Sequence, residues 1–153
     1  MELENRNNTH NTIPLTEKDI AHIADSVAQG EDSELWQDLT LSLVFETTEE
    51  IRRLNKEFRG IDRATDILSF PDREGEELPF PSFFLGDIVI APDVVERHAL
   101  SYGVSVKYEY SFVLVHGLLH LFGYDHQKES DRNEMREKEK FYMQKLGFDG
   151  VSR

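Results

Sequence analysis

Residues 106–126, VKYEYSFVLVHGLLHLFGYDH, decide the fold of this chain. They form the most apolar stretch of the sequence, and they predict a helix that Ser105 begins and Gly123 ends. A helix with apolar residues all round must be covered by other elements, so we expect it at the centre of the protein.

Three strands are expected before this central helix. Leucine and phenylalanine alternate with other residues over 38–46, as in a strand with one face toward the core. TDILSF (65–70) and FFLGDIVIA (83–91) predict two more strands, and the exposed loop DREGEELPFPS (72–82) separates them.

Four further helices are expected, at about 16–29, 47–60, 92–103 and 129–146. Because strands and helices intermingle, the sequence predicts an α/β (α+β) fold with a small mixed β-sheet packed with about five helices. We expect a single domain over residues 1–153, in which residues 1 to about 14 form an irregular N-terminal tail.

The composition excludes several classes of protein. The 153 residues contain no cysteine, so disulfides and thiolate sites are excluded, and any metal must bind to His, Asp or Glu. No apolar run approaches the roughly 20 residues of a membrane helix. The N-terminus lacks the basic start and apolar stretch of a signal peptide. These features favour a soluble, cytoplasmic protein.

The charge of the chain is unevenly distributed. A net charge of −13 opposes nonspecific binding to nucleic acid, because phosphate contacts come mainly from Lys and Arg. Residues 51–63, here called the basic island, nevertheless hold five basic side chains against Glu57 and Asp62. An acidic surface with one basic island suits docking onto a protein partner as well as binding of RNA.

Three histidines in HGLLHLFGYDH are spaced as metal ligands. His116 and His120 share one face of the helix, one turn apart, and Gly123 permits a turn that can bring His126 back toward them. Three imidazoles on a zinc-like ion leave a position open for water, as in catalytic sites. The alternative is a pair of hydrogen-bonded core histidines. Three other histidines lack such a pattern and are assigned to solvent: His10, His22 and His98.

The spacing matches the metalloprotease signature H-E-x-x-H-x-x-G-x-x-H, except that Gly117 replaces the glutamate. That glutamate is the general base of the proteases, so its absence argues against peptide hydrolysis. Asp125 either orients a histidine through its second ring nitrogen or caps the turn, and both roles stay open. Three polar residues within the expected strands are assigned to structure: Asp66, Ser69 and Asp87.

The chain resembles the YbeY family of bacterial endoribonucleases and rRNA maturation factors. The resemblance rests on LNKEFRGIDRATDILSFP (54–71), LGDIVI (85–90) and HGLLHLFGYDH, which occur in the family's order. It implies one divalent ion per chain, with zinc as the leading candidate, held by His116, His120 and His126 in a cleft beside the sheet.

The resemblance also implies that Arg59 is catalytic in that cleft. A guanidinium grips a phosphate at two points and keeps its charge as negative charge develops in the transition state. The alternative is an ordinary surface arginine at the C-terminal end of its helix.

The activity implied by the resemblance is a metal-dependent, single-strand-specific endoribonuclease in 16S rRNA 3′ end maturation and ribosome quality control. The implied partners are ribosomal RNA and the small ribosomal subunit, reached through ribosome-associated proteins, with no membrane and no DNA. Two alternatives stay open: a ribosome-assembly binding factor with a structural metal, and a metal-dependent hydrolase of another substrate. Histidine ligands accept several divalent metals, so the native ion is also open.

Overall fold

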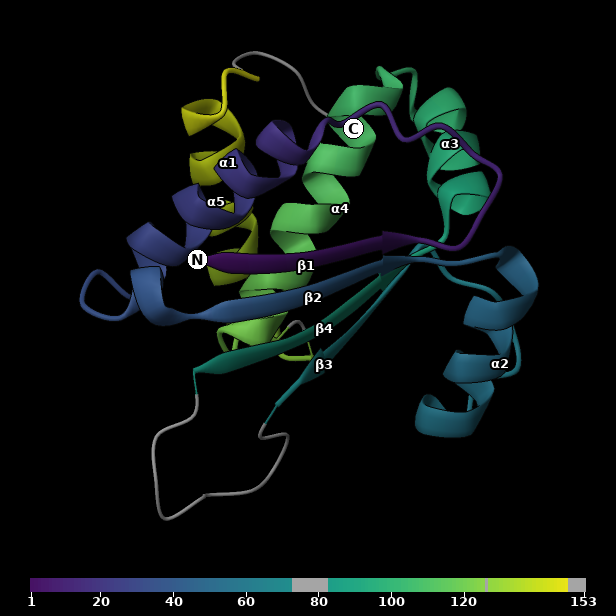
Figure 1. The fold of residues 1–153 in the computed structure, drawn as a ribbon, viewed down its shortest axis with the longest axis horizontal. Helices are drawn as coiled ribbons and strands as arrows, with labels where there is room; N and C mark the ends of the chain where they lie inside the picture. Colours follow the sequence, from purple (N-terminus) through teal and green to yellow (C-terminus); the bar gives the residue numbers. More distant parts are fainter. Residues whose placement is uncertain (73–82, 126, 149–153) are drawn as a thin grey trace.

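A computed structural model describes residues 1–72, 83–125 and 127–148 of the chain, so most of the loop expected at 72–82 lies outside the described residues. The elements in chain order are β1 (Glu2–Asn7), α1 (Glu17–Glu31), a short 3₁₀-helix (Trp36–Asp38), β2 (Thr40–Phe45), α2 (Thr48–Arg59), β3 (Ile67–Pro71), β4 (Phe84–Ile90), α3 (Pro92–Tyr102), α4 (Val106–Leu121) and α5 (Glu129–Lys145) (Figure 1).

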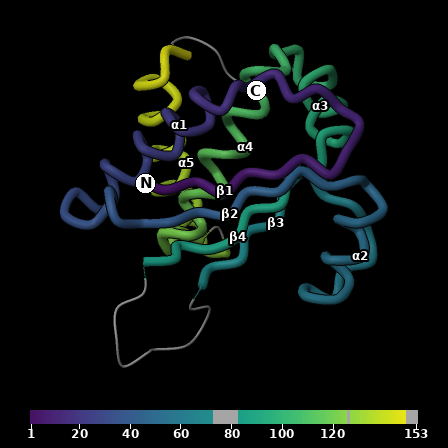
Figure 2. Tube along the Cα trace, viewed as in Figure 1, coloured from purple at the N-terminus to yellow at the C-terminus, as the bar shows by residue number. Residues whose placement is uncertain are grey.

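The strands form one mixed sheet in the order β1, β2, β4, β3. β2 pairs in parallel with both β1 and β4, whereas β3 pairs antiparallel with β4 and forms an edge of the sheet. The trace in Figure 2 shows α4 between α1 and α5 on one side and α3 on the other, while α2 stands apart at the lower right. The mixed sheet and the central helix expected from the sequence are confirmed.

The prediction of an irregular N-terminal tail is wrong for residues 2–7. They form β1, which runs parallel to β2 with Glu2 beside Thr40 and Asn7 beside Phe45. Almost all β1 side chains are exposed, so the segment carries no apolar alternation that sequence reasoning could detect. Its backbone hydrogen bonds to β2 hold it in the sheet. Residues 8–14 form neither helix nor strand, as expected.

Side chains of the strands divide the core into two clusters, because consecutive residues of a strand point to opposite faces. The larger cluster contains alternate residues of β2 and β4 packed with α1, α4 and α5, among them Leu41, Leu43, Phe45, Ile88 and Ile90. The smaller cluster joins α2 and the start of α3 to the other face, through Ile51, Leu68, Val89 and Val94. β3 and β4 are therefore covered on both faces.

α4 lies among three other helices, α1, α3 and α5. Eleven of its sixteen residues are buried, and it packs against α1, α3, α5 and β3. Ser105 begins it by accepting a hydrogen bond from the backbone N–H of Tyr108 at 3.0 Å. Within the described ranges, no helix is long and apolar enough to cross a membrane.

Candidate active site

His116 and His120 face each other near the C-terminal end of α4. They lie four residues apart, so their side chains share one face of the helix. The two Nε2 atoms are 3.1 Å apart, and the ring centroids are 4.6 Å apart. Both residues are half-buried, and the expected adjacency of the two rings is therefore found.

The other nitrogen of each ring faces an oxygen. Nδ1 of His120 lies 2.9 Å from the carbonyl oxygen of Tyr124. Nδ1 of His116 lies 3.7 Å from a carboxylate oxygen of Glu139, a largely buried residue of α5. A carbonyl or carboxylate beside a metal-binding histidine fixes the ring and its tautomer in known metal sites.

This arrangement sets the two Nε2 atoms opposite each other. The Tyr124 carbonyl can only accept a hydrogen bond, so it favours a proton on Nδ1 of His120 and a lone pair on its Nε2. That lone pair faces either an N–H of His116 or a metal ion shared by the two rings. Tetrahedral zinc at about 2.0–2.1 Å from each nitrogen separates its ligand atoms by roughly 3.3 Å. The observed 3.1 Å is close to this separation and is also a hydrogen-bond distance.

The third expected ligand, His126, lies outside the described residues. Among the residues that are described, no group of three or more His, Asp or Glu side chains is placed to hold a metal ion. The turn that leads to His126 is present, because Gly123 follows α4 with a φ of 100°, a value that favours glycine. His116 and His120 are thus the described part of the expected metal site.

Gly117 lies where α4 touches the sheet. A Cβ atom there would lie 2.6 Å from Cδ1 of Ile67, 3.1 Å from Oγ of Ser69 and 3.3 Å from Cδ1 of Ile88. A glutamate side chain would therefore have to push the side chains of Ile67, Ser69 and Ile88 aside in a close-packed interface. Helix–sheet packing explains the glycine, and the position has no room for the general base of the metalloproteases.

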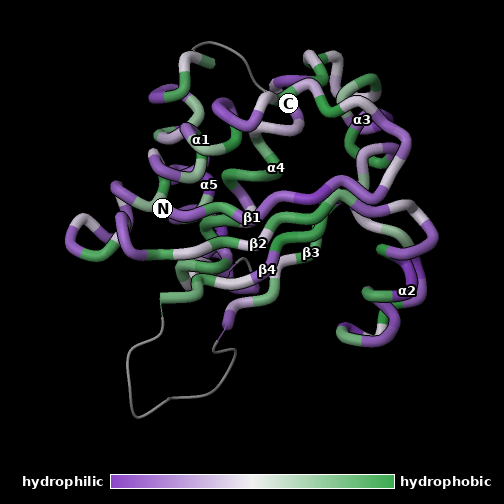
Figure 3. The backbone as a smooth tube through the Cα atoms, viewed as in Figure 1, coloured by the Kyte–Doolittle hydropathy of each residue, from purple (hydrophilic) through white to green (hydrophobic). Residues whose placement is uncertain are grey.

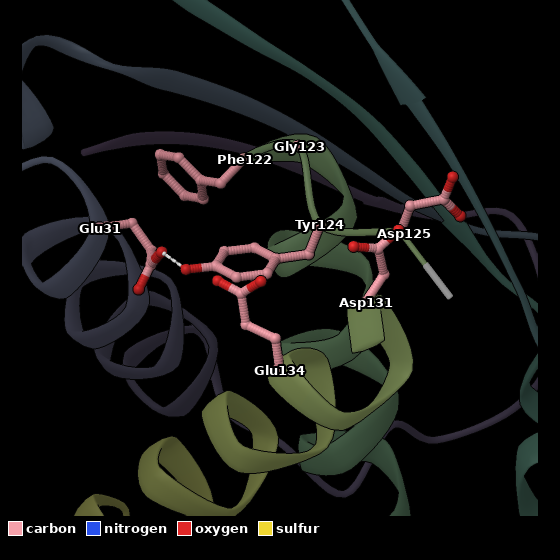
Figure 4. Close-up of a pocket in the computed structure, with 7 residues that line it drawn as sticks. All are labelled: Glu31, Phe122, Gly123, Tyr124, Asp125, Asp131 and Glu134. Atoms are coloured by element: carbon pink, nitrogen blue, oxygen red, sulfur yellow. Dashed lines mark hydrogen bonds between the residues drawn. The ribbon is translucent and has the colours of Figure 1, made fainter. Parts of the chain in front are cut away.

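The turn after α4 is held by Glu31, the last residue of α1. Glu31 accepts hydrogen bonds from the hydroxyl of Tyr124 at 2.6 Å, from Lys138 at 3.3 Å, and from the hydroxyl of Tyr142. Figure 4 shows the ring of Tyr124 pointing toward Glu31. Because the carbonyl of Tyr124 faces His120, the network fixes the residue that orients this histidine.

The electrostatics of this network favour a charged Glu31. Burial opposes ionisation of the carboxyl, but the hydrogen bonds from Tyr124, Tyr142 and Lys138 outweigh it and lower the pKa of Glu31 below its ordinary value. For Tyr124, burial and the bond to Glu31 both raise the pKa of the hydroxyl. At neutral pH Glu31 is therefore a carboxylate that accepts hydrogen bonds from the protonated hydroxyls of Tyr124 and Tyr142 and from Lys138.

A pocket of about 270 Å³ lies beside the network. Its lining includes the aromatic Phe122 and four acidic residues: Glu31, Asp125, Asp131 and Glu134 (Figure 4). Carboxylates repel phosphate, so this pocket does not suit the backbone of a nucleic acid. A phosphate is better placed on the side of the site where Arg59 lies.

Arg59 ends α2 and reaches the edge strand β3. Its Nη2 donates to the carbonyl oxygen of Ser69 at 2.9 Å, and its Cζ lies 5.0 Å from the centroid of the Phe70 ring. The hydroxyl of Ser69 in turn faces Gly117, the neighbour of His116. Arg59 therefore contacts the segment of β3 on which the histidine-bearing turn of α4 packs.

Other arginines of the basic island are paired with acidic neighbours. Arg52 lies 2.9 Å from Asp62, and Arg53 lies 2.6 Å from Glu50. Such exposed pairs contribute little to stability, but they reduce the charge that the island presents to a ligand. The ion pairs thus reduce the positive charge that Arg52 and Arg53 offer to a ligand. Arg59 is the arginine of the basic island that contacts β3.

Sequence reasoning missed the groups that orient the histidines. Tyr124 acts through its backbone carbonyl, which no side-chain pattern reveals, and Glu139 is one of many charged residues of α5. Asp125 is exposed at the pocket, whereas the oxygens beside His116 and His120 come from Glu139 and Tyr124. Nothing in the sequence marks these groups, since the contacts join separate elements.

One of the three histidines assigned to solvent is placed differently. His98 is half-buried on α3, and its Nδ1 lies 3.4 Å from a carboxylate oxygen of Asp66. The prediction of a solvent position holds only in part for this residue, because the loop before β3 folds back beside α3 and the side chain is 38% exposed. His10 and His22 are exposed, as expected.

The chain is similar to known proteins over most of its length. The family described as "Endoribonuclease YbeY" matches residues 3–147. The protein named Endoribonuclease YbeY from Desulforamulus reducens is 41% identical, and the match covers 92% of this chain and 95% of the relative. The protein of the same name from Shouchella clausii is 40% identical, and the match covers 88% of this chain and 86% of the relative. A solution structure from Thermotoga maritima, 28% identical, has a TM-score of 0.64 and covers 94% of this chain and 88% of its own. The chain therefore belongs to the endoribonuclease YbeY family.

Proposed function

We propose that this chain is a metal-dependent endoribonuclease that cleaves single-stranded RNA during the processing of ribosomal RNA. His116, His120 and His126 hold one divalent ion, for which zinc is the leading candidate, and Arg59 binds the scissile phosphate. The observation that carries the proposal is the pair of Nε2 atoms 3.1 Å apart, each on a ring whose Nδ1 faces an oxygen.

The Tyr124 carbonyl leaves the Nε2 lone pair of His120 free for a metal ion, and the Glu139 carboxylate adds negative charge beside His116. In an ordinary pair of core histidines, Nε2 of His116 would instead donate a hydrogen bond to that lone pair. A metal ion needs both rings neutral with free Nε2 lone pairs, which is the state that the Tyr124 carbonyl favours in His120. When bound, such an ion supplies Lewis-acid polarisation of a phosphate oxygen.

Arg59 has the chemistry and the position to bind the phosphate. A guanidinium has five N–H donors in a planar fork, so the bond to Ser69 can coexist with bonds to two phosphate oxygens. The carbonyl and the Phe70 ring orient the fork before RNA binds, which reduces the entropy lost on binding. Arg59 also stabilises the charge that grows on the phosphate oxygens during cleavage.

Two variants test the proposal, each with a matched control. His116→Ala should lose bound metal and RNA cleavage, and Arg59→Ala should keep the metal but lose on the order of 100-fold in cleavage rate. The exposed His22 and Arg97 provide the controls His22→Ala and Arg97→Ala, which should retain both properties.

Metal content is measured on purified protein, cleavage on a labelled single-stranded precursor RNA, and folding by circular dichroism. Continued cleavage by a folded, metal-free His116→Ala variant would overturn the proposal. A folded, metal-loaded wild type that binds precursor RNA without cleaving it would leave a ribosome-assembly binding factor as the better explanation.

The proposed setting is the cytoplasm, with the small ribosomal subunit and ribosome-associated proteins as partners. The acidic surface supports a protein partner, since a chain of net charge −13 binds free RNA weakly through bulk electrostatics. Cleavage of precursor RNA should therefore be faster within ribosomal particles than with free RNA at physiological salt. Equal rates on both substrates would argue against a partner.

A further inference from the structure

We propose that Phe58 and Phe70, with Arg59 beside them, form a stacking platform for one nucleobase of a single-stranded RNA. The inference rests on the proposed function, because it assigns a binding subsite to the same substrate. The platform lies across the edge strand β3 from the histidine pair.

Phe58 is an exposed aromatic residue on a polar helix. α2 is largely hydrophilic along its length (Figure 3), yet the Phe58 side chain near its C-terminal end is 56% exposed. A single exposed apolar residue is common on protein surfaces and requires no explanation. Phe58 differs because a second ring and a guanidinium lie beside it.

The second ring belongs to Phe70 of β3. The ring centroids of Phe58 and Phe70 are 5.5 Å apart with an angle of 68° between the planes, an edge-to-face contact. Phe70 is partly buried against the smaller core cluster, so it anchors the exposed ring. The contact holds Phe58 in place with part of its surface open to a ligand.

Arg59 adds a cation to the two rings. Its guanidinium carbon lies 5.0 Å from the centroid of Phe70, and its Nη2 is fixed by the Ser69 carbonyl. A base stacked on Phe58 would carry its phosphate within the reach of the adjacent arginine. An aromatic surface next to a positive charge is the arrangement by which proteins bind single-stranded nucleic acid.

The position relative to the histidines follows from the alternation of side chains along β3. Ile67 and Ser69 face Gly117 of α4, whereas Leu68 and Phe70 pack on the side of α2. β3 is an edge strand, so only the width of this strand separates the platform from the histidine-bearing helix. An RNA strand that crosses this edge can place one base on Phe58 and the next phosphate at Arg59.

The same features favour single-stranded RNA over the alternatives. In a duplex the faces of the bases are covered by their neighbours, so a stacking platform has nothing to bind. A protein partner would use a wider apolar surface, but the residues around Phe58 on α2 include the charged Lys56 and Glu57. Every base has a flat face, so we expect little sequence preference.

The test measures binding of a short single-stranded RNA that contains 2-aminopurine, whose fluorescence falls when the base stacks on a ring. Sugars with 2′-O-methyl groups and phosphorothioate linkages protect this RNA from cleavage, so the metal-loaded full chain can be used. Phe58→Ala should raise the Kd by about 5-fold or more and abolish the quenching. Phe58→Trp keeps an aromatic face, so it should bind with the wild-type Kd and still quench the fluorescence.

The matched control is Phe141→Ala. Phe141 on α5 is 55% exposed and also makes an edge-to-face contact, with Tyr142, but it lies outside the proposed platform. The control should bind RNA like the wild type, and circular dichroism should show both alanine variants to be folded.

The outcomes separate this inference from the proposed function. An unchanged Kd and quenching for Phe58→Ala, in a protein whose wild type cleaves RNA, would overturn the platform and leave the nuclease. An equal effect of Phe58→Ala on a duplex of the same sequence would also overturn base stacking. A wild type that neither binds nor cleaves single-stranded RNA would overturn both.

Discussion

Replacing Gly117 with alanine would add one carbon atom to the contact between α4 and the sheet. The new Cβ atom would lie 2.6 Å from Cδ1 of Ile67, closer than real carbon contacts, and 3.1 Å from Oγ of Ser69. Overpacking of this kind costs about 1–3 kcal/mol, whereas alanine in place of glycine inside a helix gains about 1 kcal/mol. We expect the free energy of unfolding to fall by about 1 kcal/mol, or Tm by about 2–4 °C.

A second substitution tests whether the close contact causes this loss. Ile67→Val removes Cδ1, the atom nearest to the new Cβ, and alone should cost about 1 kcal/mol. In the Gly117→Ala background it relieves the contact, so the double variant should be more stable than the sum of the single effects by at least about 0.5 kcal/mol.

The free energies are measured by urea unfolding, followed by circular dichroism. A chelator is present throughout, because bound metal would add its own stabilisation. Strict additivity of the two substitutions, or a Gly117→Ala variant as stable as the wild type, would refute the packing explanation for this glycine.

Two further predictions concern the groups around the histidines. Glu139→Gln keeps the size of the side chain but removes the charge beside His116, so metal affinity should fall by about 10–100-fold in chelator competition. The control is Glu137→Gln at an exposed position of the same helix. Equal metal affinities of the Glu139→Gln variant and the wild type would contradict a positioning role for Glu139. Hydrogen bonds outweigh burial to lower the pKa of Glu31, so its stabilising effect is complete above the ordinary value of 4.5 and is lost as the pH falls through the lower folded value. Glu31→Gln should therefore flatten the acid side of the stability–pH curve in urea unfolding, whereas an unchanged acid side would contradict the network.

Much of the fold could be predicted because its signals are local. Thr16 and Ser105 begin helices through bonds to residues three positions later, and the alternation over 38–46 contains β2, whose apolar side lies in the core. β1 could not be predicted from such signals. Almost all of its side chains face solvent, and its backbone pairing with β2, far away in the sequence, makes it a strand.

The candidate site divides in the same way. The adjacency of His116 and His120 follows from helix geometry and could be read from spacing, while their role as metal ligands stays a prediction, as does that of His126. The contacts of Glu139 and Glu31 join residues from different helices, and no short pattern encodes them. The pairing of Arg53 with Glu50, which lies just outside the basic island, could not be predicted either, since it depends on side-chain conformation.

Because the orientation of the histidine pair depends on α5, the pair is completed late in the synthesis of the chain. α4 carries both rings and can form as soon as residues 106–121 are made, but Glu139 and Tyr142 belong to the last helix in chain order. A nascent chain that ends before α5 thus has the two imidazoles without the carboxylate beside one and without part of the network that holds the other. The oriented pair is therefore a property of the fold with α5 in place, and it arises only after residues 129–145 have been synthesised.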